Sequence, residues 1–224
     1  MLDVSTVAPI PEGVPDSMAE RAYAAIRDRL IMLDIRPNAA IVENELARDL
    51  GAGRTPVREA LKRLEMDRLV VSYPRRGTFA TGVDITDLAH ISEIRQVLEP
   101  LAARRAAQVA NAAMRSELRE LADRTDRLDV AGIDRRELMR WDLTVHRAIY
   151  RATGNPHLRD VLVRHDDLAT RIFCLFLDRM PTVAQHVSEH VALLRAIADG
   201  EADRAAELAH DHVTGFERAI RAVV

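Results

Sequence analysis

Cysteine and long apolar runs are scarce in this sequence of 224 residues. Its single cysteine, Cys174, excludes an internal disulfide framework and suits a reducing compartment. No run of about 18 uncharged apolar residues occurs, so no membrane-spanning helix is expected. The first residues lack a basic segment followed by an apolar core, so no signal peptide is predicted. We therefore expect a cytoplasmic protein with no membrane partner.

A strong net charge is also lacking, since the formal charge is -3 at pH 7. That total gives no support to a nucleic-acid partner. Residues 54–76, however, hold seven Lys or Arg against three Asp or Glu. A local basic segment of this kind indicates a polyanion partner, although a solvated arginine-rich face would carry the same charges.

Apolar residues make up 48% of the chain, which is ample for a packed core. In the N-terminal part, three- and four-residue apolar spacing predicts a helix from Asp16 to Leu33 and a shorter helix ended by Gly51. A further helix is expected to start with Thr55 as its N-cap and Pro56 as its first residue. The expected buried stripe of this helix consists of Val57, Ala60, Leu61 and Leu64.

Two β-prone runs follow, at residues 69–73 and 78–81, around a Pro/Gly turn. Helix, helix, turn, helix and two-stranded wing is the order of a winged helix-turn-helix. We predict this domain over residues 16–82, after a flexible tail at residues 1–15. The second helix of such a motif enters the major groove of DNA, and arginines at a wing tip fit the minor groove. The candidate DNA contacts are Arg54, Thr55, Arg58, Lys62, Arg75, Arg76 and Gly77.

After a linker at residues 83–87, the sequence predicts only helices, so the predicted domain at residues 88–222 is an all-α antiparallel bundle. The fold class is mainly α: an N-terminal winged helix-turn-helix followed by this bundle. The expected helices are 86–109, 114–129, 133–153, 156–178, 182–199 and 202–222.

Several polar residues fall on the apolar faces of these helices. Asp142 and His146 lie four residues apart and fall on the buried stripe of one helix. His190 and His212 each fall on the buried stripe of a different helix. His186 falls at the margin of its stripe. One such histidine would be an ordinary core histidine, but four polar groups together are costly to bury unless something satisfies them all. Three imidazoles and a carboxylate match a divalent metal ion, zinc first, with nickel or manganese also suitable.

The string LARDLGAGRTPVREALKRLEMDRLVVSYPRRGTFA resembles the DNA-binding signature of the GntR family of bacterial regulators. The resemblance covers residues 19–82 and implies that Arg54, Thr55 and Arg58 contact operator DNA and that Gly77 is the wing-tip glycine. Some members have an arginine early in the preceding helix, where this chain has Asn44.

The second half resembles the metal-carrying, FCD-type domain of the FadR subgroup of that family. The pattern is Asp-x3-His, a Glu-His pair and a histidine 22 residues later, here Asp142, His146, Glu189-His190 and His212. The resemblance implies a homodimer that binds double-stranded operator DNA, with a small organic acid as effector beside the metal. Arg95 would pair with the carboxylate of this effector, or alternatively form a helix-surface salt bridge with Glu99.

The sequence therefore predicts a ligand-responsive transcription regulator and not an enzyme. A regulator that responds to the metal alone is an alternative. A metal-dependent hydrolase or lyase is another, but we find no partner for a general base at the site.

Overall fold

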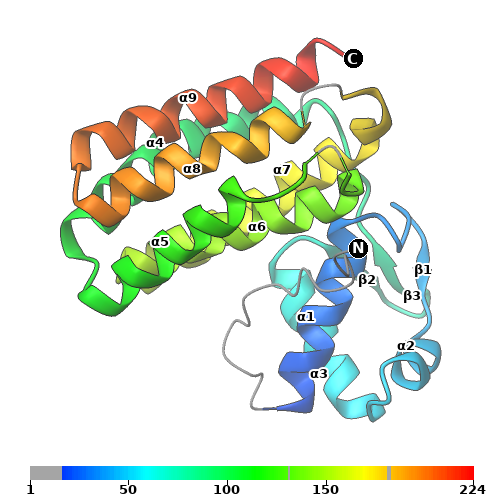
Figure 1. The fold of residues 1–224 in the computed structure, drawn as a ribbon. Coiled ribbons are helices and arrows are strands. Elements are labelled where there is room, and N and C mark those ends of the chain that lie inside the picture. The colour runs from blue at the N-terminus through cyan, green and yellow to red at the C-terminus, as the bar shows by residue number, and fades with distance from the viewer. Residues whose placement is uncertain (1–16, 131, 181–182) are drawn as a thin grey trace. The chain divides into compact units, whose positions relative to one another are not determined.

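The computed structural model describes residues 17–130, 132–180 and 183–224. The predicted tail at residues 1–15 lies outside the described residues. The chain divides into two compact units, one up to Asp84 and the other from Ile85 (Figure 1). None of the described helices is both long and apolar enough to cross a membrane.

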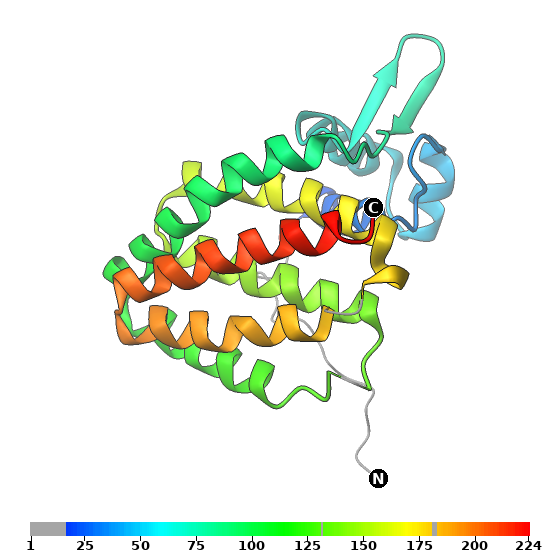
Figure 2. The ribbon, with the colours of Figure 1, turned by 90° about the horizontal axis from the view of Figure 1, so that it is seen from above.

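The first unit contains helices and a small sheet. Helix α1 packs along α3, with Ala22, Ile26 and Leu30 buried in between. The strands pair antiparallel in the order β1-β3-β2, with Val71 opposite Phe79. Strands β2 and β3 form the wing, which is the long hairpin in Figure 2. The elements are α1 (Met18–Ile31), β1 (Ala40–Ile41), α2 (Glu43–Asp49), α3 (Arg54–Met66), β2 (Val70–Tyr73) and β3 (Gly77–Ala80).

The turn between α2 and α3 depends on glycine. Gly51 has φ +58°, a conformation that suits the residue after a helix C-cap, as predicted. The predicted start of α3 was wrong: the helix begins at Arg54 with Gly53 as N-cap, and no side chain caps it. Thr55 and Pro56 therefore lie inside the first turn, where proline is tolerated because its missing N–H would have no helical partner. The predicted stripe of α3 is confirmed, since all four of its residues are buried.

In the second unit the residues form helices, with no strand among those described. Asn111 and Asn155 cap α5 and α7 by accepting bonds from backbone N–H groups. The predicted mainly α fold class is confirmed, and the predicted helix ends lie within three residues of the observed ones. The elements are α4 (Asp87–Val109), α5 (Ala112–Asp126), α6 (Arg135–Ala152), α7 (Pro156–Phe176), the 3-10 helix η1 (Leu177–Arg179), α8 (Val183–Asp199) and α9 (Ala202–Arg221).

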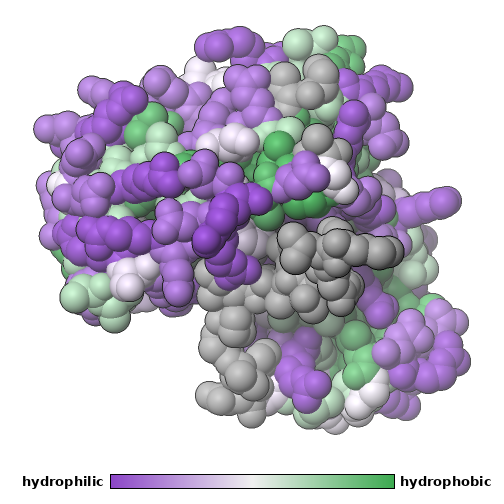
Figure 3. Space-filling view, in the orientation of Figure 1, coloured by the Kyte–Doolittle hydropathy of each residue, from purple (hydrophilic) through white to green (hydrophobic). Residues whose placement is uncertain are grey.

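The core of the second unit is formed where its long helices pack against one another in pairs. Helix α4 packs along α9, α5 packs along α8, and α6 contacts α7 and α8. Hydrophilic side chains cover most of the face of this unit seen in Figure 3, so the apolar stripes point inward. The core is not purely apolar: Trp141 Nε1 donates to Thr125 Oγ1 at 2.9 Å, and a group of buried histidines and carboxylates lies beside them.

Candidate metal centre and DNA-binding surface

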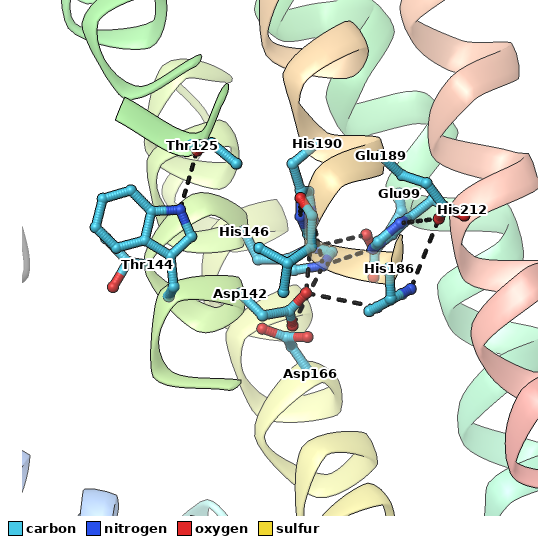
Figure 4. A network of polar contacts seen from close by, with 12 residues as sticks. Glu99, Thr125, Asp142, Thr144, His146, Asp166, His186, Glu189, His190 and His212 are labelled. Atoms are coloured by element: carbon cyan, nitrogen blue, oxygen red, sulfur yellow. Dashed lines mark hydrogen bonds and ion pairs between the residues drawn. The ribbon is translucent and has the colours of Figure 1, made fainter. Parts of the chain in front are cut away.

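The four predicted metal ligands come together inside the bundle. Helix α6 supplies Asp142 and His146, α8 supplies His190, and α9 supplies His212. All four residues are buried, and one potential ligand atom from each lies within 4.8 Å of the other three. Figure 4 shows these side chains turned towards one another. The group could therefore hold a metal ion.

The distances between the nitrogens fit a small tetrahedral ion. His146 Nε2 lies 3.3 Å from both His212 Nε2 and His190 Nε2. Oxygens of Asp142 lie 3.7 Å from His190 Nε2 and 3.8 Å from His146 Nε2. A zinc ion about 2.0–2.1 Å from each nitrogen in tetrahedral geometry separates its ligands by about 3.3–3.4 Å. The site needs little rearrangement to accept such an ion.

In each ring the hydrogen bond made by Nδ1, the nitrogen that faces away from the centre, determines which nitrogen carries the proton and which has the free lone pair. His190 Nδ1 contacts the Val187 carbonyl oxygen at 3.2 Å, and His212 Nδ1 contacts Glu189 Oε2 at 3.1 Å. His146 Nδ1 lies 3.2 Å from Glu99 Oε2. These oxygens only accept, so in each neutral ring the proton belongs on Nδ1 and the Nε2 lone pair faces the centre. Three lone pairs and a carboxylate at this separation repel one another unless a cation lies among them.

The charges around the histidines differ from ring to ring. Burial, together with the neighbouring imidazoles of His146 and His186, lowers the pKa of His190 to about 3. Burial and the neighbouring imidazoles also hold the pKa of His212 well below its usual range. Burial opposes protonation of His146 too, but the carboxylates of Asp166, Glu99 and Asp142 raise its pKa to about 9. The centre thus favours one positive charge, which a proton or a metal ion can supply.

Arg95 lies beside this centre and is buried, with 3% of its side chain exposed. Its Nε contacts Glu99 Oε1 at 2.5 Å, and its Nη2 contacts Asp166 Oδ1 at 3.1 Å. The predicted pairing with Glu99 is therefore present, but it was wrong to place that pair on the helix surface. The contact with Asp166 of α7 was not predicted. Glu99 and Asp166 therefore already form ion pairs with the guanidinium that was predicted to pair with an effector carboxylate.

His186 is a further buried member of the cluster that the sequence placed only at the margin of its stripe. Its side chain is 8% exposed and stacks on His212, with ring centroids 3.9 Å apart. It lies one helical turn before His190 on α8, and its Nε2 approaches Asp142 Oδ1 at 3.5 Å. Only the packing of α8 against α9 reveals that this ring points inward.

All the predicted DNA contacts lie at the surface of the first unit. Gly77 has φ +93°, which allows the tight turn at the wing tip. The exposed residues are Arg54, Thr55, Arg58 and Lys62 on α3, and Arg75, Arg76 and Gly77 at the wing tip.

Arg58 has an acidic neighbour that the sequence did not reveal. Its Nε donates to Glu43 Oε2 of α2 at 2.6 Å. Asn44, which stands where some relatives have arginine, is exposed next to Glu43. The first turns of α2 and α3 therefore present one shared polar surface.

Two family models match the chain. The model described as "Bacterial regulatory proteins, gntR family" matches residues 18–80. The model of the FCD domain matches residues 90–215, which is more than half of the chain. The first covers the winged helix-turn-helix, and the second covers the buried histidine cluster.

Curated relatives match over shorter stretches. An HTH-type transcriptional regulator in an unstable DNA locus of Streptomyces ambofaciens is 44% identical over 62 residues, 28% of this chain and 26% of that protein. An HTH-type transcriptional regulator in the TAR-I ttuE-ttuC' intergenic region of Agrobacterium vitis is 35% identical over 91 residues, 38% of this chain and 53% of that protein. The chain thus matches about a quarter and about half of the lengths of these relatives.

Solved structures share the fold over most of the chain. E. coli McbR/YncC superposes with a TM-score of 0.73 at 22% identity, covering 90% of this chain and 98% of that one. A GntR transcriptional regulator from Rhodococcus sp. RHA1 superposes with a TM-score of 0.66 at 23% identity, covering 92% and 98% of the two chains. At these identities the likeness shows the fold alone.

Proposed function

The chain belongs to the GntR family of bacterial regulatory proteins and carries an FCD domain, and on that premise we propose that a small organic acid controls its affinity for operator DNA. As a member of this family it is a transcription regulator that binds DNA and not an enzyme. The effector, the metal and the residues that bind each of them are the proposal. The carrying observation is the convergence of three Nε2 atoms and the Asp142 carboxylate on one buried point.

On the DNA side, α3 is the element that would enter the major groove. Arg54 and Arg58 lie on its first turns, where guanidinium groups can make two-pronged bonds to guanine or phosphate. Thr55 and Lys62 would contact phosphates. At the wing tip, Arg75 and Arg76 beside Gly77 would enter the minor groove. Helix-turn-helix proteins bind two half-sites as dimers, which supports a homodimer on a palindromic operator. The protein would act in the cytoplasm.

On the effector side, Asp142, His146, His190 and His212 would hold a divalent ion, most suitably zinc, with nickel or manganese as alternatives. When bound, the metal would act as a Lewis acid for an oxygen of the effector, which would join the four protein ligands as a fifth. Arg95 would bind the effector carboxylate by sharing its guanidinium between that group and its present partners, Glu99 and Asp166. Binding of the acid would favour one arrangement of the paired DNA-binding domains over another.

The test is an operator titration. An operator is first selected from a random DNA pool, and its affinity is then measured with metal-free protein, with zinc-loaded protein, and with zinc-loaded protein plus organic acids. We expect acids to change the affinity of the zinc-loaded protein only. A change on metal addition alone, with no effect of any acid, would instead identify a metal sensor.

A further inference from the structure

One exposed carboxylate lies beside the buried candidate metal centre. The side chain of Glu189 is 42% exposed, and its Oε2 lies 3.1 Å from His212 Nδ1. His212 itself is only 4% exposed, and the other three candidate ligands are buried more deeply still. Of the described residues that could hold an ion in this part of the bundle, Glu189 is therefore the one that bulk solvent reaches.

Two stacked imidazoles connect this carboxylate to the interior. His186 Nδ1 lies 3.7 Å from Glu189 Oε2, and His186 Nε2 lies 3.5 Å from Asp142 Oδ1 (Figure 4). His212 has the same arrangement, with Nδ1 at Glu189 and Nε2 at the centre. The two ring planes are 13° apart, and their centroids are 3.9 Å apart. Each ring thus extends from the exposed carboxylate to the buried centre, with one nitrogen at each end.

The groups at this edge of the centre could themselves bind a cation. Glu189, His186 and His212 each offer a ligand atom, and these atoms lie within 4.8 Å of one another. The inner atoms His186 Nε2 and Asp142 Oδ1 have no hydrogen-bond partner within the described parts of the chain, although buried polar atoms normally have one. A carboxylate has about four lone-pair sites, so Glu189 can accept from His212 and bind an ion at the same time.

An ion at this edge would be held more weakly than one at the centre. The lone pairs of an imidazole lie in the plane of its ring, so two nearly parallel rings cannot both direct them at one ion. An ion bound by Glu189 and His186 would therefore keep water as its remaining ligands. The inner group offers four protein ligands, which makes it the favoured position.

We propose that Glu189 and His186 form an outer site that captures the metal ion from solvent and exchanges it with the buried centre through His212. This inference rests on the proposed function, since it assigns the route by which the proposed centre gains and loses its ion. The ion would bind first to Glu189 and to His186 Nδ1. It would then move to the inner nitrogens as the Nε2 atoms replace these outer ligands.

Charge supports a capture role for Glu189. An exposed carboxylate at the entrance to a buried site raises the local concentration of cations and so the rate at which they enter. The other carboxylates beside the centre are not available for this. Glu99 and Asp166 are 5% and 1% exposed, and both form ion pairs with Arg95.

The experiment measures the rates of zinc exchange in the full chain. Metal-free protein is mixed rapidly with zinc and a fluorescent zinc indicator, and zinc-loaded protein is mixed with excess chelator. The variants are Glu189→Gln, which keeps an acceptor for His212 Nδ1, and His186→Phe, which keeps a flat ring against His212. The controls at exposed positions of α9 are Glu207→Gln and His210→Phe. Zinc content at equilibrium and helical circular dichroism are measured for every variant.

We expect uptake and release of zinc to slow about tenfold in both variants, because the outer site lies on the route in both directions. The zinc content at equilibrium should stay at the wild-type level, since the four inner ligands remain. The two controls should exchange zinc at the wild-type rates.

Wild-type rates in Glu189→Gln and His186→Phe would overturn the inference and leave Glu189 as a group that only orients His212. Loss of zinc from His186→Phe at equilibrium would also overturn it, because His186 would then be a ligand of the inner ion. Failure of the wild type to bind zinc at all would count against the proposed function as well, whereas the first two outcomes count against the route alone.

Discussion

Arg58 donates from Nε to Glu43 Oε2 at 2.6 Å, across the turn that joins α2 to α3. The pair is partly exposed, with 56% and 30% of the two side chains accessible, so it contributes little to the stability of the fold. The ion pair instead orients the guanidinium of Arg58. With Nε occupied, the two terminal nitrogens of Arg58 remain as a fork, which is the end that binds the O6 and N7 atoms of guanine.

Replacing Arg58 tests the DNA-binding surface. We expect Arg58→Ala to weaken operator binding by about 1–3 kcal/mol per half-site, enough to remove specific binding in a gel-shift assay. The histidine cluster lies in the other unit, so zinc content should not change. Arg204→Ala, at an exposed arginine of α9, is the control and should bind like the wild type. Undiminished affinity of Arg58→Ala would contradict the assignment of α3.

Glu43→Gln tests the orientation of Arg58. Removing a negative charge near the DNA should raise the affinity for random duplexes, while the loss of the ion pair should lower the affinity for the selected operator. The ratio of the two affinities should fall at least about fivefold. Fluorescence anisotropy on both duplexes at several salt concentrations measures it. A parallel change in both affinities would mean that Glu43 acts through its charge alone and does not orient Arg58.

His190→Ala tests the candidate metal centre. The imidazole is fully buried and lies at contact distance from both His146 and Asp142, so its removal should abolish stoichiometric zinc binding. The midpoint of thermal unfolding should also fall, because a metal that binds only the folded state stabilises it. Elemental analysis and thermal unfolding measure the two effects. His210→Ala, at an exposed position on α9, should leave both unchanged.

Asp166→Asn tests how Arg95 is used. The buried carboxylates of Asp166 and Glu99 both neutralise its guanidinium, so an effector carboxylate has to compete with them. Removing the charge of Asp166 should therefore strengthen the binding of malate to the zinc-loaded protein by about threefold or more. Calorimetric titration of the variant and the wild type compares the affinities. Unchanged or weaker binding of the acid would argue against Arg95 as its partner.

Helical periodicity made much of this structure predictable. The spacing of Asp142, His146, His190 and His212 placed each residue on an inward face, and the structure brings all four together. Strand β1 was missed because a two-residue strand has no detectable pattern. The start of α3 was placed two residues late, since Thr-Pro is typical of a cap and first position although Gly53 provides the cap and Arg54 begins the helix.

The contacts that the sequence did not reveal join elements with no fixed spacing between them. His186 lies beside His212 because of how α8 packs on α9, and Asp166 reaches Arg95 because of how α7 packs on α4. Glu43 meets Arg58 across the turn of the motif, 15 residues along the chain. Periodicity assigns a residue to a face of its own helix, whereas these pairings depend on the angles and registers between helices.

The most direct test of the account is an anomalous scattering measurement on crystals of the protein, purified without chelator and then soaked in zinc. We predict one peak among the Nε2 atoms of His146, His190 and His212, about 2.0–2.1 Å from each, with an oxygen of Asp142 completing the contacts. Absence of any anomalous peak there after zinc soaking, with the imidazoles bonded to one another or to water, would contradict it.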